Sequence, residues 1–332
     1  MVWLQFLTSA LLIVIAGVKL VKYTDILSDK LSLSKAWLGV ILLGLVTSLP
    51  EAITSITALI SFQATDLAVG NMLGSNLFNL MIIVLLDAMY RKGSVTDAIE
   101  PNAANILPAV FAILLSMIVG TEIFIGSKMT LPRIGFMSYG LLAVAVIYLV
   151  GIRILGKIGA IGSLSGPVSS AGKNSPILSK VILVLSLNAV LVIVASIGLT
   201  DSCETIAHLT NLGRTFIGST LLAWSTSLPE IVVSVSAFRI GSFDMAFGNI
   251  FGSNMVNMFI VFICSFFYRK GPILAAVSQT HVFSAMAVIM ISCLALAGIF
   301  SKNKKKYAHM GIDSITMSIF FVVIIAVLYR LK

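Results

Sequence analysis

Two acidic side chains stand where a charge is least favourable in this sequence. Glu51 and Glu230 each lie near the middle of an apolar stretch and directly follow a proline, Pro50 or Pro229. Insertion scales put the penalty for an acidic residue at the centre of a membrane helix at about 2.5 to 3.5 kcal/mol. A fixed Lys or Arg would offset this penalty, but the stretches concerned carry such residues only at their ends. We therefore expect a mobile counter-charge, such as a metal ion, Na⁺ or H⁺.

Oxygen-bearing side chains accompany both glutamates at helical spacing. Residues four apart share one face of a helix, and this spacing relates Thr47, Glu51 and Ser55; Thr226, Glu230 and Ser234; Ser75 and Asn79; and Ser253 and Asn257. A proline within a helix also frees a backbone carbonyl. Oxygen ligands of these kinds suit hard cations such as Ca²⁺ better than soft transition metals. Each Ser, Thr or Asn taken alone could equally be an interhelical hydrogen-bonding residue.

The rest of the sequence has the composition of a membrane protein. Of its 332 residues, 58% are hydrophobic and 11% are charged, and apolar runs of about 20 residues, long enough to span a bilayer, recur throughout. The formal charge of +9 comes from Lys and Arg between these runs, so we expect topology signals and membrane lipid as a partner, and no nucleic acid. Neither an enzyme nor a bound cofactor is expected, because no nucleophile and base pair up and the three cysteines lack disulfide or zinc spacing.

Ten apolar segments can be separated at the polar clusters. They lie near residues 3–20, 36–60, 67–90, 105–120, 136–152, 178–198, 213–238, 243–268, 281–300 and 313–331. A stretch rich in Gly and Ser divides them five and five. We therefore predict a first half at residues 1–152, a flexible cytoplasmic linker at 153–177 and a second half at 178–332.

The two halves repeat each other. TSLPEAITSITALI from Thr47 and TSLPEIVVSVSAFR from Thr226 share seven of fourteen residues, and GNMLGSNLFNL from Gly70 and GNIFGSNMVNM from Gly248 share six of eleven. Because five spans is an odd number, the second half must enter the membrane from the opposite side, so the repeat is expected to be inverted. Asp66 and Asp244 also coincide in the two halves, and we interpret them as helix N-caps.

The positive charges predict the orientation. With the N-terminus outside, 15 of the 22 Lys and Arg residues fall at cytoplasmic ends and loops. The positive-inside rule then places both termini on the external side of a multi-pass protein, which we assign to the plasma (cell inner) membrane.

The duplicated motifs resemble the α-repeats of the sodium/calcium exchanger family, within the cation/calcium antiporter superfamily. The residues concerned are TSLPE with GSNLFN in the first half and TSLPE with GSNMVN in the second. The resemblance implies an all-α membrane protein of ten transmembrane helices in two inverted five-helix repeats, with a central site between the second, third, seventh and eighth helices. It also implies that the first and sixth helices form a sliding gate.

The resemblance further implies a function and a set of ligands. The function is secondary active antiport of Ca²⁺ against Na⁺ by alternating access, for which a monomer suffices. Carried over by position, the metal ligands are Thr47, Ser48, Glu51, Ser75, Asn79, Thr226, Ser227, Glu230, Ser253 and Asn257, with backbone carbonyls near Gly44 and Ala223.

The sequence also departs from the family pattern. Val46 and Ser225 stand where family members usually have Gly, and both Asn79 and Asn257 are amides where prokaryotic members often have an Asp in one half. Two carboxylates remain, enough to neutralise one Ca²⁺ or two monovalent ions. The SLPE form resembles sodium-coupled members more than proton-coupled ones, which implies coupling to Na⁺. An H⁺-coupled exchanger, a Mg²⁺ or Mn²⁺ exchanger of the same fold, and a cation channel stay open as alternatives.

Overall fold

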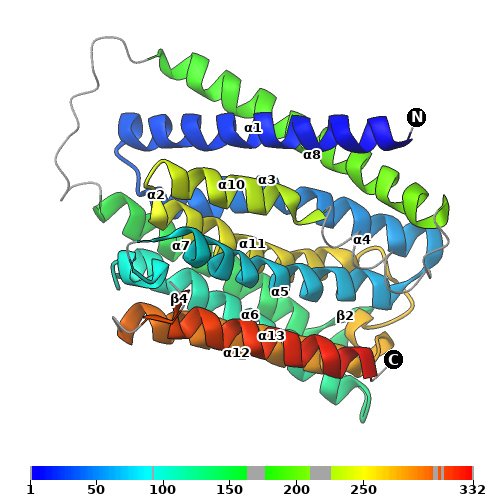
Figure 1. Cartoon of the computed structure of the whole chain (residues 1–332). Coiled ribbons are helices and arrows are strands. Elements are labelled where there is room, and N and C mark those ends of the chain that lie inside the picture. The colour runs from blue at the N-terminus through cyan, green and yellow to red at the C-terminus, as the bar shows by residue number, and fades with distance from the viewer. Residues whose placement is uncertain are drawn as a thin grey trace.

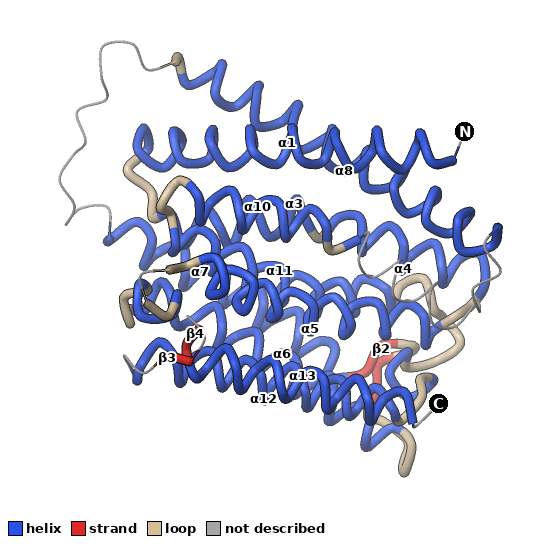
Figure 2. Tube along the Cα trace, in the orientation of Figure 1, coloured by secondary structure: helices blue, strands red, loops and turns tan. Residues whose placement is uncertain are grey.

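The structure is a computed structural model and describes residues 2–91, 93–162, 176–209, 226–301, 306–307 and 310–330. This part of the chain is almost entirely helical, with long helices lying side by side in layers (Figure 1). Strands occur in the described residues as two short antiparallel hairpins (Figure 2), in which Arg133 pairs with Ser138 and Lys306 with Gly311. The predicted all-helical architecture therefore agrees with the structure.

The elements follow one another in this order: α1 (Val2–Leu31), α2 (Lys35–Leu38), the π-helix η1 (Gly39–Leu43), α3 (Gly44–Thr47), α4 (Leu49–Phe62), α5 (Thr65–Met89), the 3₁₀-helix η2 (Val95–Ala98), α6 (Ala103–Gly126), β1 (Arg133–Ile134), β2 (Met137–Ser138), α7 (Tyr139–Gly162), α8 (Leu178–Leu209), α10 (Leu228–Arg239), α11 (Phe243–Ser265), the 3₁₀-helix η4 (Ile273–Ala276), α12 (Thr280–Ser301), β3 (Lys306–Tyr307), β4 (Met310–Gly311) and α13 (Ile312–Arg330).

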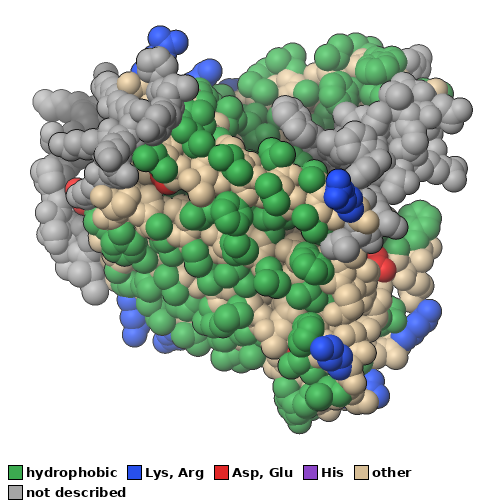
Figure 3. Space-filling model, turned by 60° about the horizontal axis from the view of Figure 1, so that its bottom comes forward, with side chains coloured by type: hydrophobic (Ala, Val, Ile, Leu, Met, Phe, Trp, Pro, Cys, Tyr) green, Lys and Arg blue, Asp and Glu red, His purple; other side chains and the backbone are tan. Residues whose placement is uncertain are grey.

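Eight helical segments of the described chain are long and apolar enough to cross a membrane: Val2–Leu31, Lys35–Phe62, Thr65–Met89, Ala103–Gly126, Tyr139–Gly159, Leu178–Ser202, Phe243–Ser265 and Thr280–Ser301. A shorter apolar helix covers Ile312–Leu328. Hydrophobic side chains spread over the face shown in Figure 3, with the Lys and Arg mainly toward its margins. The chain is thus a multi-pass integral membrane protein.

The fifth long helix of the chain, α7, extends past the boundary predicted at residue 152, and residues 163–175 of the expected linker lie outside the described residues.

The segment Lys35–Phe62 is broken into successive helical pieces. In η1 the hydrogen bonds widen, so that the Gly44 N–H reaches back to the Gly39 carbonyl. A second break follows at Ser48 (φ −86°, ψ −2°), and Pro50 stands in the first turn of α4. Proline is tolerated there because the first helical N–H groups have no partner within the helix. Pro229 likewise stands in the first turn of α10, which begins at Leu228. Pro50 thus lies within the helical segment Lys35–Phe62, at the break where its helix restarts, in line with the expectation of a proline that interrupts a membrane helix.

The helix α11 runs through the middle of the bundle and crosses the pieces α2 and η1 at very short range. A Cβ atom added at Gly252 would lie 2.5 Å from the Val40 Cα, and one added at Gly248 would collide with the Ala36 carbonyl oxygen. Only glycine permits this approach between backbones. Across the bundle, α1 packs along α8 as a separate layer with a small core of its own, formed by Ile13, Ala195 and Leu199.

Asp66 and Asp244 are not the N-caps that the sequence predicted. The N-cap positions belong to Ala64 and Ser242. Asp66 Oδ1 instead accepts a hydrogen bond from the Ser278 N–H (2.6 Å) and pairs with His281 Nε2 (3.1 Å). Asp244 Oδ1 accepts from Asn105 Nδ2 at 2.9 Å. Each carboxylate therefore joins the start of one membrane helix to the start of another, α5 to α12 and α11 to α6.

The glycine crossing yields a stability prediction. Gly252→Ala should destabilise the fold by about 1 to 3 kcal/mol, because the backbone of Val40 cannot give way to a methyl group. The measurement is thermal unfolding of the purified protein in detergent. Gly93→Ala is the control, since its Cβ would make only ordinary contacts, 3.7 Å from the Tyr90 ring. Equal unfolding temperatures for the two variants would contradict the close crossing.

Candidate cation site

Both glutamates lie in the first turn of a helix that begins inside the protein. Glu51 stands in α4 and Glu230 in α10, each 0% exposed. The two carboxylates are close enough for their charges to interact, and Thr47 and Ser48 lie within interaction reach of the Glu230 carboxylate. The N-terminus of a helix carries a partial positive charge, which favours a carboxylate in its first turn. The break in each segment therefore supplies a favourable field for the glutamate that follows it.

Many of the predicted ligands carry buried oxygens that have no hydrogen-bond partner among the described residues. Buried polar atoms in proteins are nearly always paired, so such a group of unpaired oxygens indicates a place for a ligand. Nine of these atoms belong to predicted ligands: both carboxylate oxygens of Glu51 and of Glu230, the hydroxyls of Ser48, Ser75 and Ser227, and the amide oxygens of Asn79 and Asn257. All seven residues are at most 1% exposed.

A reciprocal network of asparagines connects α5 with α11. Asn76 Nδ2 donates to the Asn254 backbone carbonyl (3.2 Å), and Asn254 Nδ2 donates to the Asn76 carbonyl (3.3 Å). Asn79 Nδ2 donates to Asn254 Oδ1 (3.1 Å), and Asn257 Nδ2 to Asn76 Oδ1 (2.9 Å). The sequence analysis did not select Asn76 and Asn254, although their repetition in both GSN motifs was a usable signal.

Two further asparagines, at equivalent positions of the two halves, each bond to a glutamate-bearing helix. Asn71 Nδ2 donates to Ser55 Oγ at 3.0 Å and to the Glu51 carbonyl at 3.4 Å. In the other half, Asn249 Nδ2 donates to Ser234 Oγ at 2.9 Å and to the Glu230 carbonyl at 3.5 Å. Ser55 and Ser234, which share a helix face with the glutamates, therefore serve to attach α4 to α5 and α10 to α11.

Other predicted ligands are bonded to one another. Thr47 Oγ1 lies 3.1 Å from Ser253 Oγ and donates to Asn249 Oδ1 at 3.4 Å. The Gly44 carbonyl accepts from the Ser48 N–H (3.2 Å) and from Ser253 Oγ (3.5 Å). Thr226 is fully buried and also has an interaction partner. Ala223 lies outside the described residues.

No basic side chain in the described chain forms an ion pair with either glutamate. The ion pairs recorded there join Lys35 to Asp25 (2.6 Å) and His281 to Asp66 (3.1 Å). Among the same residues, no group of three or more His, Cys, Asp or Glu side chains could hold a metal. A cation near the glutamates would thus take two carboxylates, and its other ligands would be hydroxyl and amide oxygens.

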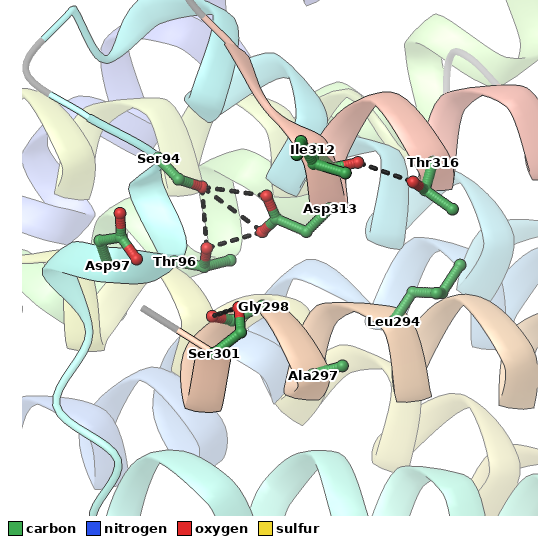
Figure 4. Close-up of a pocket in the computed structure, with 10 residues that line it drawn as sticks. All are labelled: Ser94, Thr96, Asp97, Leu294, Ala297, Gly298, Ser301, Ile312, Asp313 and Thr316. Carbon is green, nitrogen blue, oxygen red and sulfur yellow. Dashed lines mark hydrogen bonds between the residues drawn. The ribbon is translucent and has the colours of Figure 1, made fainter. Parts of the chain in front are cut away.

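A cavity of about 210 Å³ lies elsewhere, between η2, α12 and α13 (Figure 4). Its Asp313 carboxylate accepts hydrogen bonds from Thr96 Oγ1 (2.6 Å) and Ser94 Oγ (3.2 Å). Nearby, Asp87 accepts from the Val95 N–H (2.6 Å) and the Gly311 N–H (2.8 Å). These bonds attach the loop after α5 to the start of α13. None of the residues that line the cavity is a predicted ligand, so the cavity is separate from the glutamate site.

The asparagine network predicts a loss of stability on truncation. Asn76→Ala removes the acceptor of Asn257 and a donor to Asn254, and leaving one buried polar group unpaired costs about 1 to 3 kcal/mol. We expect a lower unfolding temperature in detergent. The control Thr8→Ala removes an exposed hydroxyl that bonds only within its own helix, to the Leu4 and Gln5 carbonyls, and should leave that temperature nearly unchanged. A stable Asn76→Ala variant would argue against the network.

Comparison with known proteins gives concordant matches. The family described as "Sodium/calcium exchanger protein" matches residues 1–159 and 180–330. The inner membrane protein YrbG of Escherichia coli is 30% identical over 255 residues, which cover 76% of this chain and 75% of that protein. The sodium/calcium exchanger MaX1 of Methanosarcina acetivorans is 34% identical over 124 residues, 37% of this chain and 33% of that protein.

The fold is similar to that of a solved exchanger. The structure of the sodium-calcium exchanger NCX_Mj, soaked with Na⁺ and Ca²⁺, superposes with a TM-score of 0.73 at 20% identity and covers 97% of this chain and 96% of that one. At this identity the likeness concerns the arrangement of the helices.

Proposed function

This chain belongs to the sodium/calcium exchanger family, and from that premise we propose that it is a secondary active antiporter that exchanges Ca²⁺ for Na⁺. The observation that carries the proposal is that nine unpaired, buried oxygens belong to predicted ligands, among them both carboxylate oxygens of Glu51 and of Glu230. Two carboxylates with hydroxyl and amide oxygens form a ligand set for hard cations. The transported ions are therefore substrates of this site.

We assign the ligands in two groups. The unpaired oxygens of Glu51, Glu230, Ser48, Ser75, Ser227, Asn79 and Asn257 are available to a cation directly. Thr47, Thr226, Ser253 and the carbonyl of Gly44 would join them only after rearrangement of their present interactions. The carbonyl near Ala223 stays a proposed ligand outside the described residues.

The proposed architecture is two inverted halves of five spans each, the first ending with α7 and the second beginning with α8, with both termini external in the cell inner membrane. Reciprocal bonds between equivalent residues of the two GSN motifs support it. So does the position of the chain ends, because α1 begins and α13 ends at the same end of the bundle (Figure 1), as an even number of spans requires.

The mechanism follows from the charge of the site. Ca²⁺ and Na⁺ compete for the same two carboxylates, and either form of loading neutralises them. An empty site would hold two buried negative charges close together, a state that is strongly unfavourable away from water. The protein can therefore change between its inward-facing and outward-facing conformations when the site is loaded, but not when it is empty. Each passage of one ion must then be followed by the return of the other, which couples the two fluxes.

Removal of either carboxylate should abolish exchange. In proteoliposomes, Glu51→Gln or Glu230→Gln should reduce ⁴⁵Ca²⁺ uptake driven by an outward Na⁺ gradient by at least about 100-fold, because one remaining charge cannot balance Ca²⁺ in a buried site. Glu100→Gln, at an exposed loop position, should transport normally. Near-normal transport by both site variants would refute the assignment.

The same vesicles distinguish the alternatives. Uptake driven by a pH gradient in the absence of Na⁺ would indicate coupling to H⁺, and competition by Mg²⁺ or Mn²⁺ would indicate another divalent substrate. Unitary currents without counter-flux would indicate a channel.

A further inference from the structure

The side-chain amides of Asn79 and Asn257 are held in one orientation. The constraint starts from backbone carbonyls, which can only accept hydrogen bonds. Asn76 Nδ2 donates to the Asn254 carbonyl, so the Oδ1 of Asn76 is the atom that lies toward Asn257. Because that oxygen is an acceptor, Asn257 must place its donor Nδ2 against it. The reciprocal bonds fix Asn254 and Asn79 in the same way.

The fixed orientation leaves the oxygen of each amide outside the asparagine network. Asn79 Oδ1 and Asn257 Oδ1 are buried and have no hydrogen-bond partner among the described residues. If either amide rotated by half a turn, it would set its oxygen against the Oδ1 of Asn254 or Asn76 and lose a hydrogen bond. The two asparagines are thus neutral oxygen donors, and the charge of the site comes from Glu51 and Glu230 alone within the described residues.

From this charge count we infer that the protein exchanges one Ca²⁺ for two Na⁺ and moves no net charge in a cycle, with Asn79 and Asn257 as the residues that set the ratio. The inference rests on the proposed function and specifies it further. One Ca²⁺ or two Na⁺ bring the site to neutrality. A third Na⁺ would leave an unbalanced positive charge in the core, and burying such a charge costs several kcal/mol.

Of the nine unpaired, buried oxygens of the predicted ligands, the four that share negative charge belong to Glu51 and Glu230. An aspartate at position 79 or 257 would change this balance, since it adds a negative charge for a third Na⁺. An ionised aspartate also cannot donate a hydrogen bond to the Oδ1 of Asn254 or Asn76, so the hydrogen bond that fixes the side chain at that position would be lost.

The test is the null point of Ca²⁺ flux in proteoliposomes of the full chain. Na⁺ is set at a tenfold gradient, K⁺ with valinomycin sets the membrane potential, and the opposing Ca²⁺ ratio is varied until net ⁴⁵Ca²⁺ flux stops. Exchange of two Na⁺ for one Ca²⁺ places the null point at a Ca²⁺ ratio of about 100, independent of potential, whereas three Na⁺ would place it at about 1,000 and shift it about tenfold per ~59 mV.

Variants supply the second arm of the test. Asn79→Asp and Asn257→Asp should each move the null point with potential, by up to about tenfold per ~59 mV, as a third Na⁺ becomes bound. The control Asn102→Asp adds the same charge at the exposed N-cap of α6, where Asp caps equally well, and should stay independent of potential.

The outcomes separate the two proposals. A wild-type null point that shifts with potential overturns the two-for-one ratio and leaves Na⁺-driven exchange standing. If Na⁺ drives no Ca²⁺ uptake at all, both proposals fail. If an Asp variant does not fold, as size-exclusion chromatography would show, the wild-type null point decides by itself.

Discussion

The structure depends on the need to keep two carboxylates deep in an apolar bundle, with no fixed cation beside them in the part of the chain that the structure describes. The surrounding fold lowers the electrostatic energy of the pair in several small ways. Each glutamate stands in the first turn of a helix, where the backbone N–H groups make a positive field. Hydroxyl and amide oxygens of the predicted ligands have no hydrogen-bond partner among the described residues, which suits the cation coordination proposed above.

The breaks in the helices are a consequence of the same need. A continuous helix through Glu51 would place the carboxylate in its interior, with no free N–H groups nearby. The wide turn of η1 and the break at Ser48 restart the helix immediately before the glutamate. The close glycine crossing then allows α11 to bring Ser253 up to the broken segment.

Sequence reasoning reached the features that depend on composition and local spacing. The apolar runs gave the membrane class, and the duplicated GSN motifs contain the asparagines that the structure joins across the two halves. It also anticipated an interruption at Pro50, which lies at the break between α3 and α4 within the segment Lys35–Phe62. The partners of Asn76 and Asn254 lie 178 residues away, beyond the reach of any local pattern. Asp66 and Asp244 were misinterpreted for the same reason, since their partners begin other helices.

The mutual bonds of Asn76 and Asn254 also have an evolutionary meaning. Each residue donates to the backbone of the other and accepts from the neighbour of the other, so neither can be exchanged without stranding groups in the opposite half. After a gene duplication, most positions of the two copies are free to drift apart. Asn76 and Asn254 are constrained together, because a substitution of one of them requires a compensating substitution at the equivalent position of the other half.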